Sequence, residues 1–309
     1  MKAVHYRRFG GPEVLEFDEL PDPTLGPHGV LVRTRAAGVN PLDWKAREGL
    51  LASLADAVFP VVGGFDVAGT VERVGVSVTE FAPGDEVMGY VWQDVLRSGT
   101  FAELVVAPVR TLARKPADLS WEAAAALPLA GLAAYQSVVH RLRVRAGETV
   151  LVHAAAGGVG LFAVQLARWR GARVIGTASE HNHDFLRGLG VQPVAYGSAL
   201  AERVRQLAPD GVDAVLDAVG RRALRASREL LRPAGRLASL VEPKVTELGG
   251  SYVFARPDAA DLAALGRLAE EKRLAVEVAR TYPLEQAAEA QQLLREGHTR
   301  GKLVLSVGA

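Results

Sequence analysis

A pair of glycines near the middle of the chain is the feature that points most directly to chemistry. Residues 150–167 read VLVHAAAGGVGLFAVQLA, in which only His153 and Gln165 are plainly polar. A membrane span needs ~20 apolar residues, and this slightly shorter run is interrupted by Gly157 and Gly158. A strand, a glycine turn and a helix from Gly160 fit better, although a plain core unit has the same pattern. Such a turn directs helix N–H groups at a pyrophosphate, so we predict dinucleotide binding, with Gly160 allowing close packing of the helix on the sheet.

The end of the next predicted strand bears on the choice of cofactor. An NAD site places a carboxylate about 20 residues beyond the turn, where it accepts from the ribose 2′-hydroxyl. Here the strand ends without a carboxylate and is followed by Ser179, Glu180 and His181. Ser179 and His181 could donate to a 2′-phosphate that a carboxylate would repel, which favours NADP(H) over NAD(H). An exposed loop is the alternative for His181 and His183, and a His-x-His metal site has no further ligand to complete it.

Composition excludes several kinds of site. The 309 residues include no cysteine, so disulfides, thiolate zinc sites and thiol nucleophiles are ruled out. The net charge is +1 and the charges are interspersed, which does not indicate a nucleic-acid surface or a polybasic membrane patch. Five arginines at 221–232 are interrupted by leucines at helical spacing, as on a solvated helix face. No Ser-His-Asp or Cys-His arrangement is recognisable, so hydrolysis has no support.

The elements that must position these residues change in kind along the chain. Short β-forming segments at 30–36, 70–75 and 101–106, separated by turn signals, predict a β-rich first domain. Ser120 is a predicted N-cap of a helix that Pro128 splits or kinks. Strands then alternate with helices, and the strands are predicted at 150–153, 173–176, 211–217 and 235–240. Repeated units of this kind imply a doubly wound parallel sheet. Asp258 caps a further helix, another runs from Pro283 to Gly297, and residues 302–307 form a last strand.

Six segments together carry a family resemblance. They are AAGVNPLDWKAREG (36–49), GGFDVAGTVERVG (63–75), FAPGDEVMG (81–89), LPLAGLAAYQSV (127–138), AAAGGVG (154–160) and GHTRGKLVLSV (297–307). Over nearly its whole length the chain resembles the zinc-independent, zeta-crystallin-like quinone oxidoreductases of the medium-chain dehydrogenase/reductase superfamily. This family carries alanine ahead of the paired glycines, as Ala154 does here. The resemblance implies a Rossmann nucleotide-binding domain (119–257) inserted into a GroES-like β-rich catalytic domain (1–118 plus 258–309).

The resemblance also implies roles for individual residues. Asn40 and Trp44 would line the nicotinamide and substrate cleft. Asp43 is a candidate proton relay, although an Asp after Asn-Pro-Leu is also typical of a turn or helix cap. The implied cofactor site comprises Asn40, Ala156, Gly157, Gly158, Val159, Ser179, His181, Tyr196, Ala218, Val219, Leu240, Arg300 and Lys302. The alternative for Tyr196 is a strand-end aromatic residue, and for Arg300 and Lys302 a solvated turn.

Zinc chemistry is not expected. Zinc alcohol dehydrogenases of the same superfamily carry a Cys near 40–43, a His at the position of Phe65 and a four-cysteine lobe, all missing here. Asp66 alone cannot supply the three protein ligands of a catalytic zinc. The resemblance implies NADPH-dependent hydride transfer to a quinone or an α,β-unsaturated carbonyl, with Asn40 or backbone N–H groups meeting the developing oxyanion. The alternatives are a non-catalytic NADPH-binding sensor, a crystallin-like structural protein or a zinc alcohol dehydrogenase.

The first residues, MKAVHYRRFGG, lack the apolar region of a signal peptide, so we expect a cytoplasmic protein. The expected partners are a small-molecule electron acceptor and a second copy of the chain, but neither nucleic acid nor a membrane. The family implies the homodimer, for which residues 251–255 could provide an edge strand.

Overall fold

The computed structural model describes residues 1–297 and 299–308, without the side chains of Arg221 and Arg222. The chain forms two compact units. Unit 1 comprises Met1–Leu132, Arg256–Lys272 and Val276–Ala309, and unit 2 comprises Ala133–Ala255 and Arg273–Ala275. The second unit is thus inserted into the first, with boundaries at 132/133 and 255/256 where the sequence predicts 118/119 and 257/258.

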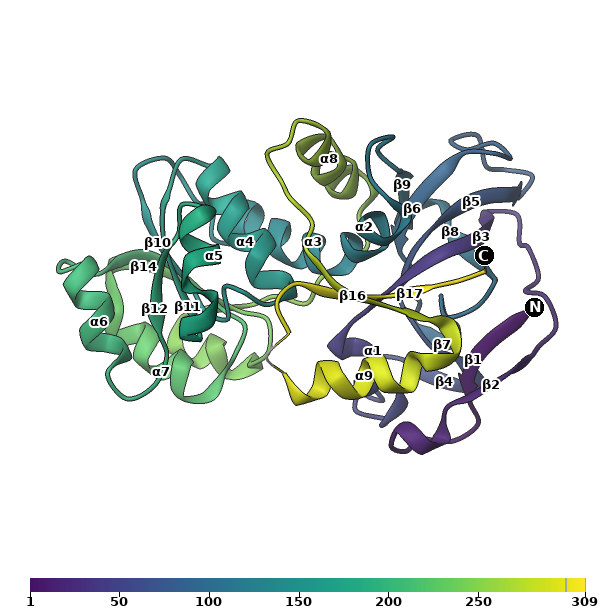
Figure 1. The fold of residues 1–309 in the computed structure, drawn as a ribbon, viewed down its shortest axis with the longest axis horizontal. Coiled ribbons are helices and arrows are strands. Elements are labelled where there is room, and N and C mark those ends of the chain that lie inside the picture. The colour runs from purple at the N-terminus through teal and green to yellow at the C-terminus, as the bar shows by residue number, and fades with distance from the viewer. Residues whose placement is uncertain (298, 309) are drawn as a thin grey trace. The chain divides into compact units, whose positions relative to one another are not determined.

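Unit 1, over its described residues, is built on two β-sheets (Figure 1). One has the order β16 (Val278–Pro283), β17 (Lys302–Ser306), β3 (Gly29–Val39), β5 (Asp66–Val74), β6 (Glu86–Tyr90) and β9 (Leu112–Arg114), with β8 (Leu104–Pro108) also paired to β3. The other has the order β2 (Glu16–Glu19), β1 (Lys2–Tyr6), β4 (Asp56–Val62) and β7 (Val95–Ser98). Inward-facing valines of β3, β5 and β6 form a shared core, which is the β-rich domain that the sequence predicts.

The helices of unit 1 begin largely where the sequence predicts. Ser120 Oγ accepts from the Ala123 N–H at the start of α2 (Trp121–Ala126), and Pro128 separates α2 from α3 (Pro128–Tyr135). Helix α2 packs on β3, β5 and β17, and for this reason it belongs to unit 1 instead of the inserted unit. The remaining helices are α1 (Pro41–Arg47), α8 (Ala259–Glu270), which Asp258 caps, and α9 (Ala287–Glu296). Helix α9 begins later than predicted because a 3-10 turn, Leu284–Gln286, precedes it.

Unit 2 contains a parallel sheet with the order β12 (Gln192–Ala195), β11 (Arg173–Ala178), β10 (Thr149–Val152), β13 (Val212–Asp217), β14 (Leu231–Ser239) and β15 (Ser251–Tyr252). In chain order this is 3-2-1-4-5-6, the order of dinucleotide-binding folds, so the predicted doubly wound sheet is confirmed. Helices α4 (Gly158–Trp169) and α5 (His183–Gly188) follow the first two strands. Helices α6 (Leu200–Leu207) and α7 (Arg221–Leu230) contact each other and share a core with the strands.

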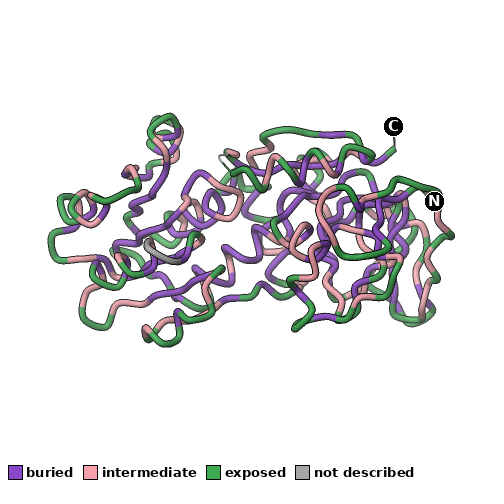
Figure 2. The backbone as a smooth tube through the Cα atoms, turned by 90° about the horizontal axis from the view of Figure 1, so that it is seen from below, coloured by how far each residue is buried: buried purple, intermediate pink, exposed green. Residues whose placement is uncertain are grey.

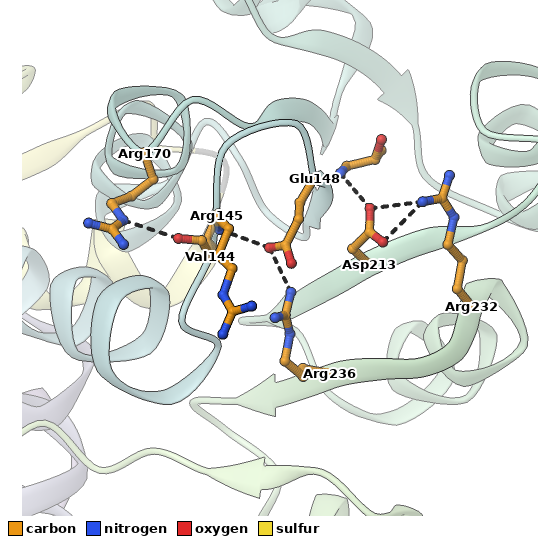
Figure 3. Close-up of polar contacts among 8 residues, drawn as sticks. Val144, Arg145, Glu148, Arg170, Asp213, Arg232 and Arg236 are labelled. Carbon is orange, nitrogen blue, oxygen red and sulfur yellow. Dashed lines mark hydrogen bonds and ion pairs between the residues drawn. The ribbon is translucent and has the colours of Figure 1, made fainter.

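Ion pairs hold together the strand ends of unit 2 that lie opposite the glycine turn (Figure 3). Asp213 accepts from the Thr149 N–H at 2.8 Å and pairs with Arg232 at 3.0 Å. Glu148 pairs with Arg236 at 2.7 Å. Arg232 therefore belongs to a paired strand, which corrects the prediction of one solvated helix face for 221–232. Within α7 the prediction holds for Arg225 and Arg228, which are exposed.

Burial follows the same division between strands and loops. Buried residues line the central strands, whereas exposed residues lie mainly along the connecting loops (Figure 2). The predicted edge strand at 251–255 pairs over only two residues, Ser251 and Tyr252. In the part of the chain that the structure describes, the helices are too short or too polar to cross a bilayer.

Candidate functional site

A buried polar cluster in unit 1 gathers residues that lie far apart in the sequence. Asn40 follows β3, Asp43 lies on α1, Asp66 begins β5 and Lys302 begins β17. Because β3 pairs with both β5 and β17, the ends of these strands meet. Their exposed fractions are 1% for Asn40, 3% for Asp43, 0% for Asp66 and 4% for Lys302, so water does not screen these charges. We call these four residues the polar cluster.

Hydrogen bonds fix the orientation of the Asn40 amide. Its Nδ2 donates to Asp66 Oδ2 at 2.9 Å, and its Oδ1 accepts from Lys302 Nζ. Lys302 Nζ also donates to the Val39 carbonyl at 2.8 Å, and Asp66 Oδ1 accepts from the Leu129 N–H at 2.8 Å. The Asn40 amide thus lies between the carboxyl group of Asp66 and the ammonium group of Lys302, and each of its two polar atoms has a hydrogen-bond partner.

Burial perturbs the proton affinities of the cluster. It raises the pKa of Asp66 to about 6, against the opposing effects of Lys302 and of the hydrogen bonds from Asn40 and Leu129. It raises the pKa of Asp43 well above the usual range for an Asp, and it lowers the pKa of Lys302. Perturbed groups of this kind concentrate at functional sites, although structural ion pairs also produce them.

Asp43 has two different oxygen environments. Its Oδ2 accepts from the Asn40 N–H at 2.6 Å, which confirms the helix-cap interpretation for this residue. Its Oδ1 is buried and has no hydrogen-bond partner among the described residues. Asp43 and Phe65 line a cavity of about 20 Å³, which has room for about one water molecule. The Phe65 ring is stacked on Trp92 with ring centroids 5.5 Å apart.

A metal ion does not fit the polar cluster. The Asn40 amide oxygen already accepts from the Lys302 ammonium, and Asn40 and Leu129 already occupy the oxygens of Asp66. Phe65 offers no ligand atom, and no described histidine joins the two carboxylates. Elsewhere in the described part of the chain, one group has metal-ligand chemistry, His5 with Glu16 and Asp18 on β1 and β2. There His5 Nε2 already lies 3.2 Å from Asp18 Oδ2, a diagonal neighbour on the paired strand.

The other predicted site residues of unit 1 lie outside the polar cluster's hydrogen bonds. Trp44, on α1, packs against the Arg295 guanidinium at 5.2 Å from the ring centroid. Arg300 pairs with Glu277 at 3.3 Å. Lys302 is fully enclosed, so the alternative of a solvated turn is wrong for it. The sequence presents Asp66 only as an insufficient zinc ligand, and no local pattern indicates its place in the polar cluster.

In unit 2 the glycine turn has a different geometry from the predicted one. Helix α4 begins at Gly158, two residues earlier than expected, and Gly157 is its N-cap. A Cβ at position 160 would lie 2.1 Å from the Ala154 carbonyl oxygen, so Gly160 closes the turn by letting the start of α4 lie against the backbone that follows β10. A Cβ at Gly157 would meet only that oxygen, at 3.3 Å, which leaves the outer side of the turn open. Ala154 has φ +52°, a conformation that usually favours glycine.

The predicted 2′-phosphate residues gather at the ends of β11 and β12. The pairing of Ala178 with Ala195 places Ser179 and Tyr196 on adjacent strand ends. Ser179 Oγ accepts from Asn182 Nδ2 at 3.3 Å and lies 3.4 Å from His181 Nε2. Tyr196 is 56% exposed, so its ring is available to a ligand.

A buried carboxylate organises the ends of the next two strands. Asp217 Oδ1 accepts from the N–H groups of Val219 at 3.0 Å and Gly220 at 2.9 Å, and Oδ2 accepts from Ser239 Oγ at 2.7 Å. The Asp217 carbonyl accepts from the Leu240 N–H at 2.9 Å. The predicted residues Ala218, Val219 and Leu240 are thus brought together by Asp217, which the sequence did not single out. The signal available was an Asp ending an apolar strand.

Removing the Lys302 ammonium should leave the buried carboxylates of the polar cluster without a compensating positive charge. We expect Lys302→Met to lower the free energy of unfolding by about 3–5 kcal/mol at pH 8, because Asp66 then lacks its charge partner. The loss should shrink at pH 5, below the Asp66 pKa of about 6, because the protonated carboxyl needs no cation. Urea unfolding at both pH values measures this. The control Lys302→Met/Asp66→Asn should recover most of the loss, and a double variant as unstable as the single one would contradict the pairing.

Two glycine substitutions should separate turn closure from ligand access. Gly160→Ala should lower the thermal unfolding midpoint, because its Cβ would overlap the Ala154 carbonyl. Gly157→Ala should fold nearly as well as the parent chain but bind NADPH at least ~10-fold more weakly, because the methyl group occupies the phosphate side of the turn. Calorimetry and NADPH fluorescence titration provide the two readouts. Equal thermal midpoints for the two variants would contradict the claim that a Cβ is crowded at position 160 but not at position 157.

Family models match both parts of the chain. One described as alcohol dehydrogenase GroES-like domain matches residues 26–117, and one described as zinc-binding dehydrogenase matches residues 189–305. Quinone oxidoreductase from Rattus norvegicus is 32% identical over 99% of this chain and 97% of its own length. Spectinabilin polyketide synthase system protein NorB from Streptomyces orinoci is 37% identical over 92% of this chain, which spans only 13% of that protein.

Solved structures agree with these matches. Quinone oxidoreductase from Coxiella burnetii superposes with a TM-score of 0.89 at 34% identity, covering 100% of this chain and 99% of that one. An NAD-dependent alcohol dehydrogenase gives 0.89 at 38% identity, with both chains covered completely. A mycobacterial protein complexed with NADPH gives 0.86 at 32% identity, covering 99% of this chain and 100% of its own. The inserted Rossmann unit, the GroES-like β-rich unit and these relatives together show that the chain belongs to the quinone oxidoreductase family of the medium-chain dehydrogenase/reductase superfamily.

Proposed function

We propose that this chain is an NADPH-dependent oxidoreductase that reduces quinones or α,β-unsaturated carbonyl compounds without zinc. The observation that carries the proposal is the polar cluster, in which Asn40 donates to Asp66 and accepts from Lys302 where a zinc enzyme of the superfamily needs metal ligands. An alcohol oxidation assisted by a metal would need a donor set that these residues do not provide. A quinone or an enone is already electrophilic, so its reduction needs hydrogen-bond donors and orientation rather than a Lewis acid.

The cofactor assignment rests on the ends of the parallel strands in unit 2. The N–H groups at the start of α4 are candidates to hold the pyrophosphate, and Ser179, His181 and Tyr196 to surround the 2′-phosphate. No carboxylate ends β11, which supports NADPH over NADH. The mycobacterial relative complexed with NADPH supports this choice, whereas the NAD-dependent relative does not. When bound, NADPH supplies a hydride from the nicotinamide ring.

Residues of unit 1 would stabilise the negative charge on the acceptor oxygen and supply the proton that the reduced product needs. Negative charge develops on the acceptor oxygen, and donors fixed in advance stabilise it most effectively. Asn40 has a fixed amide whose second Nδ2 hydrogen makes only a long contact, 3.4 Å to the Gly38 carbonyl. Burial raises the pKa of Asp43 well above the usual range for an Asp, and this residue, whose Oδ1 has no partner among the described residues, lines the small cavity. We assign donation to Asn40 and proton supply to Asp43, through one water molecule.

Turnover tests the proposal directly. We expect NADPH absorbance to fall when purified protein meets a panel of para-quinones and enones, and to stay constant with saturated ketones, which are weaker hydride acceptors. Tight NADPH binding without turnover of any acceptor would support a sensor or a crystallin-like structural protein instead. Turnover of primary alcohols with oxidised cofactor would support the alcohol dehydrogenase alternative.

Cofactor choice can be tested at the end of β11. Ser179→Asp should lower kcat/KM for NADPH by ~100-fold, because the new carboxylate repels the 2′-phosphate, and should change the value for NADH by less than ~3-fold. Ser179→Ala is the matched control and should weaken NADPH only modestly, since it removes a donor without adding charge. Equal losses for both cofactors in the Asp variant would show that Ser179 does not meet the 2′-phosphate.

The homodimer and the cytoplasmic location are retained as parts of this proposal. The short edge strand β15 supports the first, because a strand at a sheet edge presents unpaired backbone groups to a second copy.

A further inference from the structure

A buried histidine that the proposed reaction does not use lies at the end of β10. His153 is 1% exposed, and it follows directly after the strand and precedes the glycine turn. Its Nδ1 lies 3.3 Å from Thr177 Oγ1 at the end of β11, and its Nε2 lies 2.8 Å from Ser227 Oγ on α7. Thr177 and Ser227 are buried as well, and among the described residues these three side chains hydrogen-bond to one another and to nearby backbone groups.

The surrounding hydrogen bonds determine the direction of this chain of groups. The Ser227 hydroxyl donates to the Ala223 carbonyl at 2.6 Å, and a hydroxyl has a single proton, so Ser227 Oγ must accept from His153 Nε2–H. Thr177 Oγ1 accepts from the Ala154 N–H at 3.1 Å, which leaves its own proton free to be donated to His153 Nδ1. In the other tautomer, with the proton on Nδ1, Ser227 would have to donate to His153 Nε2 and would lose its hydrogen bond to the Ala223 carbonyl. All groups are satisfied only when the imidazole is neutral with its proton on Nε2.

The electrostatic environment agrees with a neutral ring. Burial lowers the pKa of His153 to about 4, even though the nearby Asp217 opposes this shift. At neutral pH the ring therefore carries no charge, and the order of donors described above persists.

The same chain of bonds holds the backbone of the glycine turn. Thr177 binds two consecutive N–H groups, that of Ala154 through Oγ1 and that of Ala155 through its carbonyl at 2.9 Å. Ala154 has φ +52°, which costs about 1–2 kcal/mol for a residue other than glycine. Its carbonyl in turn accepts from the Gly157 N–H at 2.9 Å. A constraint on Ala154 is therefore a constraint on the whole turn up to the start of α4.

We propose that His153, as the Nε2–H tautomer, is a positioning residue for cofactor binding. By accepting from the Thr177 hydroxyl, it aims the Thr177 lone pair at the Ala154 N–H and keeps the turn in the left-handed conformation that presents its N–H groups to a pyrophosphate. Ser227 anchors the other side of the ring to α7. All of these residues belong to unit 2, and the inference rests on the proposed function only in taking the ligand to be a nicotinamide dinucleotide.

Removal of single hydroxyl groups tests the proposal. Thr177→Val keeps the shape of the side chain but loses both hydrogen bonds, and should raise the Kd for NADPH by ~10-fold or more. Thr177→Ser keeps the hydroxyl and should stay within ~3-fold of the parent chain. Ser227→Ala leaves His153 Nε2–H without an acceptor and should also weaken binding. Ser137→Ala is the matched control, because Ser137 is a buried hydroxyl of the same unit that donates to the carbonyl four residues earlier, as Ser227 does.

For every variant, the thermal unfolding midpoint is measured first. The Kd for NADPH is then measured by fluorescence titration at a temperature well below that midpoint. A purely structural role predicts lower midpoints for the Val and both Ala variants with unchanged Kd, and that result would overturn the proposal. Histidine labelled with ¹⁵N supplies a second readout, in which the His153 signal, identified by its loss in His153→Gln, should show a protonated Nε2 and an unprotonated Nδ1. The opposite tautomer would also overturn it.

The failures of the two proposals can be told apart. If the parent chain binds neither NADPH nor NADH, the proposed function fails and no positioning role remains. If it binds cofactor but Thr177→Val and Ser227→Ala bind equally well, only the role of His153 fails. If it binds NADH alone, the Kd values of the parent chain and of these two variants are compared with NADH, and that comparison tests the role of His153.

Discussion

The ammonium group of Lys302 is the buried charge on which the organisation of unit 1 depends. Enclosing a lysine is unfavourable by several kcal/mol unless opposite charges and hydrogen-bond acceptors surround it. Here the amide of Asn40 and the carbonyl of Val39 accept hydrogen bonds from the ammonium, and the carboxyl groups of Asp66 and Asp43 act on it electrostatically. Because Lys302 begins β17, this requirement ties the last strand of the chain to β3 and β5 in one arrangement. In the same arrangement, hydrogen bonds from protein groups occupy oxygen atoms that a metal would need as ligands. The contacts that organise unit 1 therefore also support the proposed chemistry without a metal.

Both units use one device to fix backbone at their sites, a buried side-chain acceptor bonded to main-chain N–H groups. Asp66 accepts from Leu129 in unit 1. In unit 2, Thr177 accepts from Ala154, and Asp217 from Val219 and Gly220. An acceptor enclosed in protein cannot exchange its partner for water without a large loss, so each holds its turn in one conformation. Turns fixed in advance lose little entropy when a ligand binds.

Local signals in the sequence predicted the parts of the fold that local interactions decide. Ser120 and Asp258 cap helices because their oxygens reach nearby N–H groups, and Pro128 separates two helices because it lacks a donor. The alternation of apolar strands with helices was sufficient for the parallel sheet. The short strands β1, β4 and β7 were missed because they carry mixed polarity and form only by pairing with distant segments.

The candidate site was predictable to the extent that motifs carry it. The glycine turn and Asn40 were found, but not the partners that hold them, because Lys302 and Asn40 are 262 positions apart and no local pattern links them. His153 was visible as one polar residue at the end of an apolar strand, and its partners Thr177 and Ser227 come from other elements. Sequence spacing identifies which residues could bind a ligand, whereas three-dimensional packing decides which residues hold them in place.

The central claim, reduction without a metal, is tested most directly by one measurement of rate against metal content. Purified protein is dialysed against a strong chelator, its zinc is quantified by mass spectrometry, and NADPH oxidation with its best acceptor is followed before and after zinc is added back. The account predicts the same rate throughout, with zinc far below one equivalent. A rate that is lost with the metal and restored by zinc would contradict it.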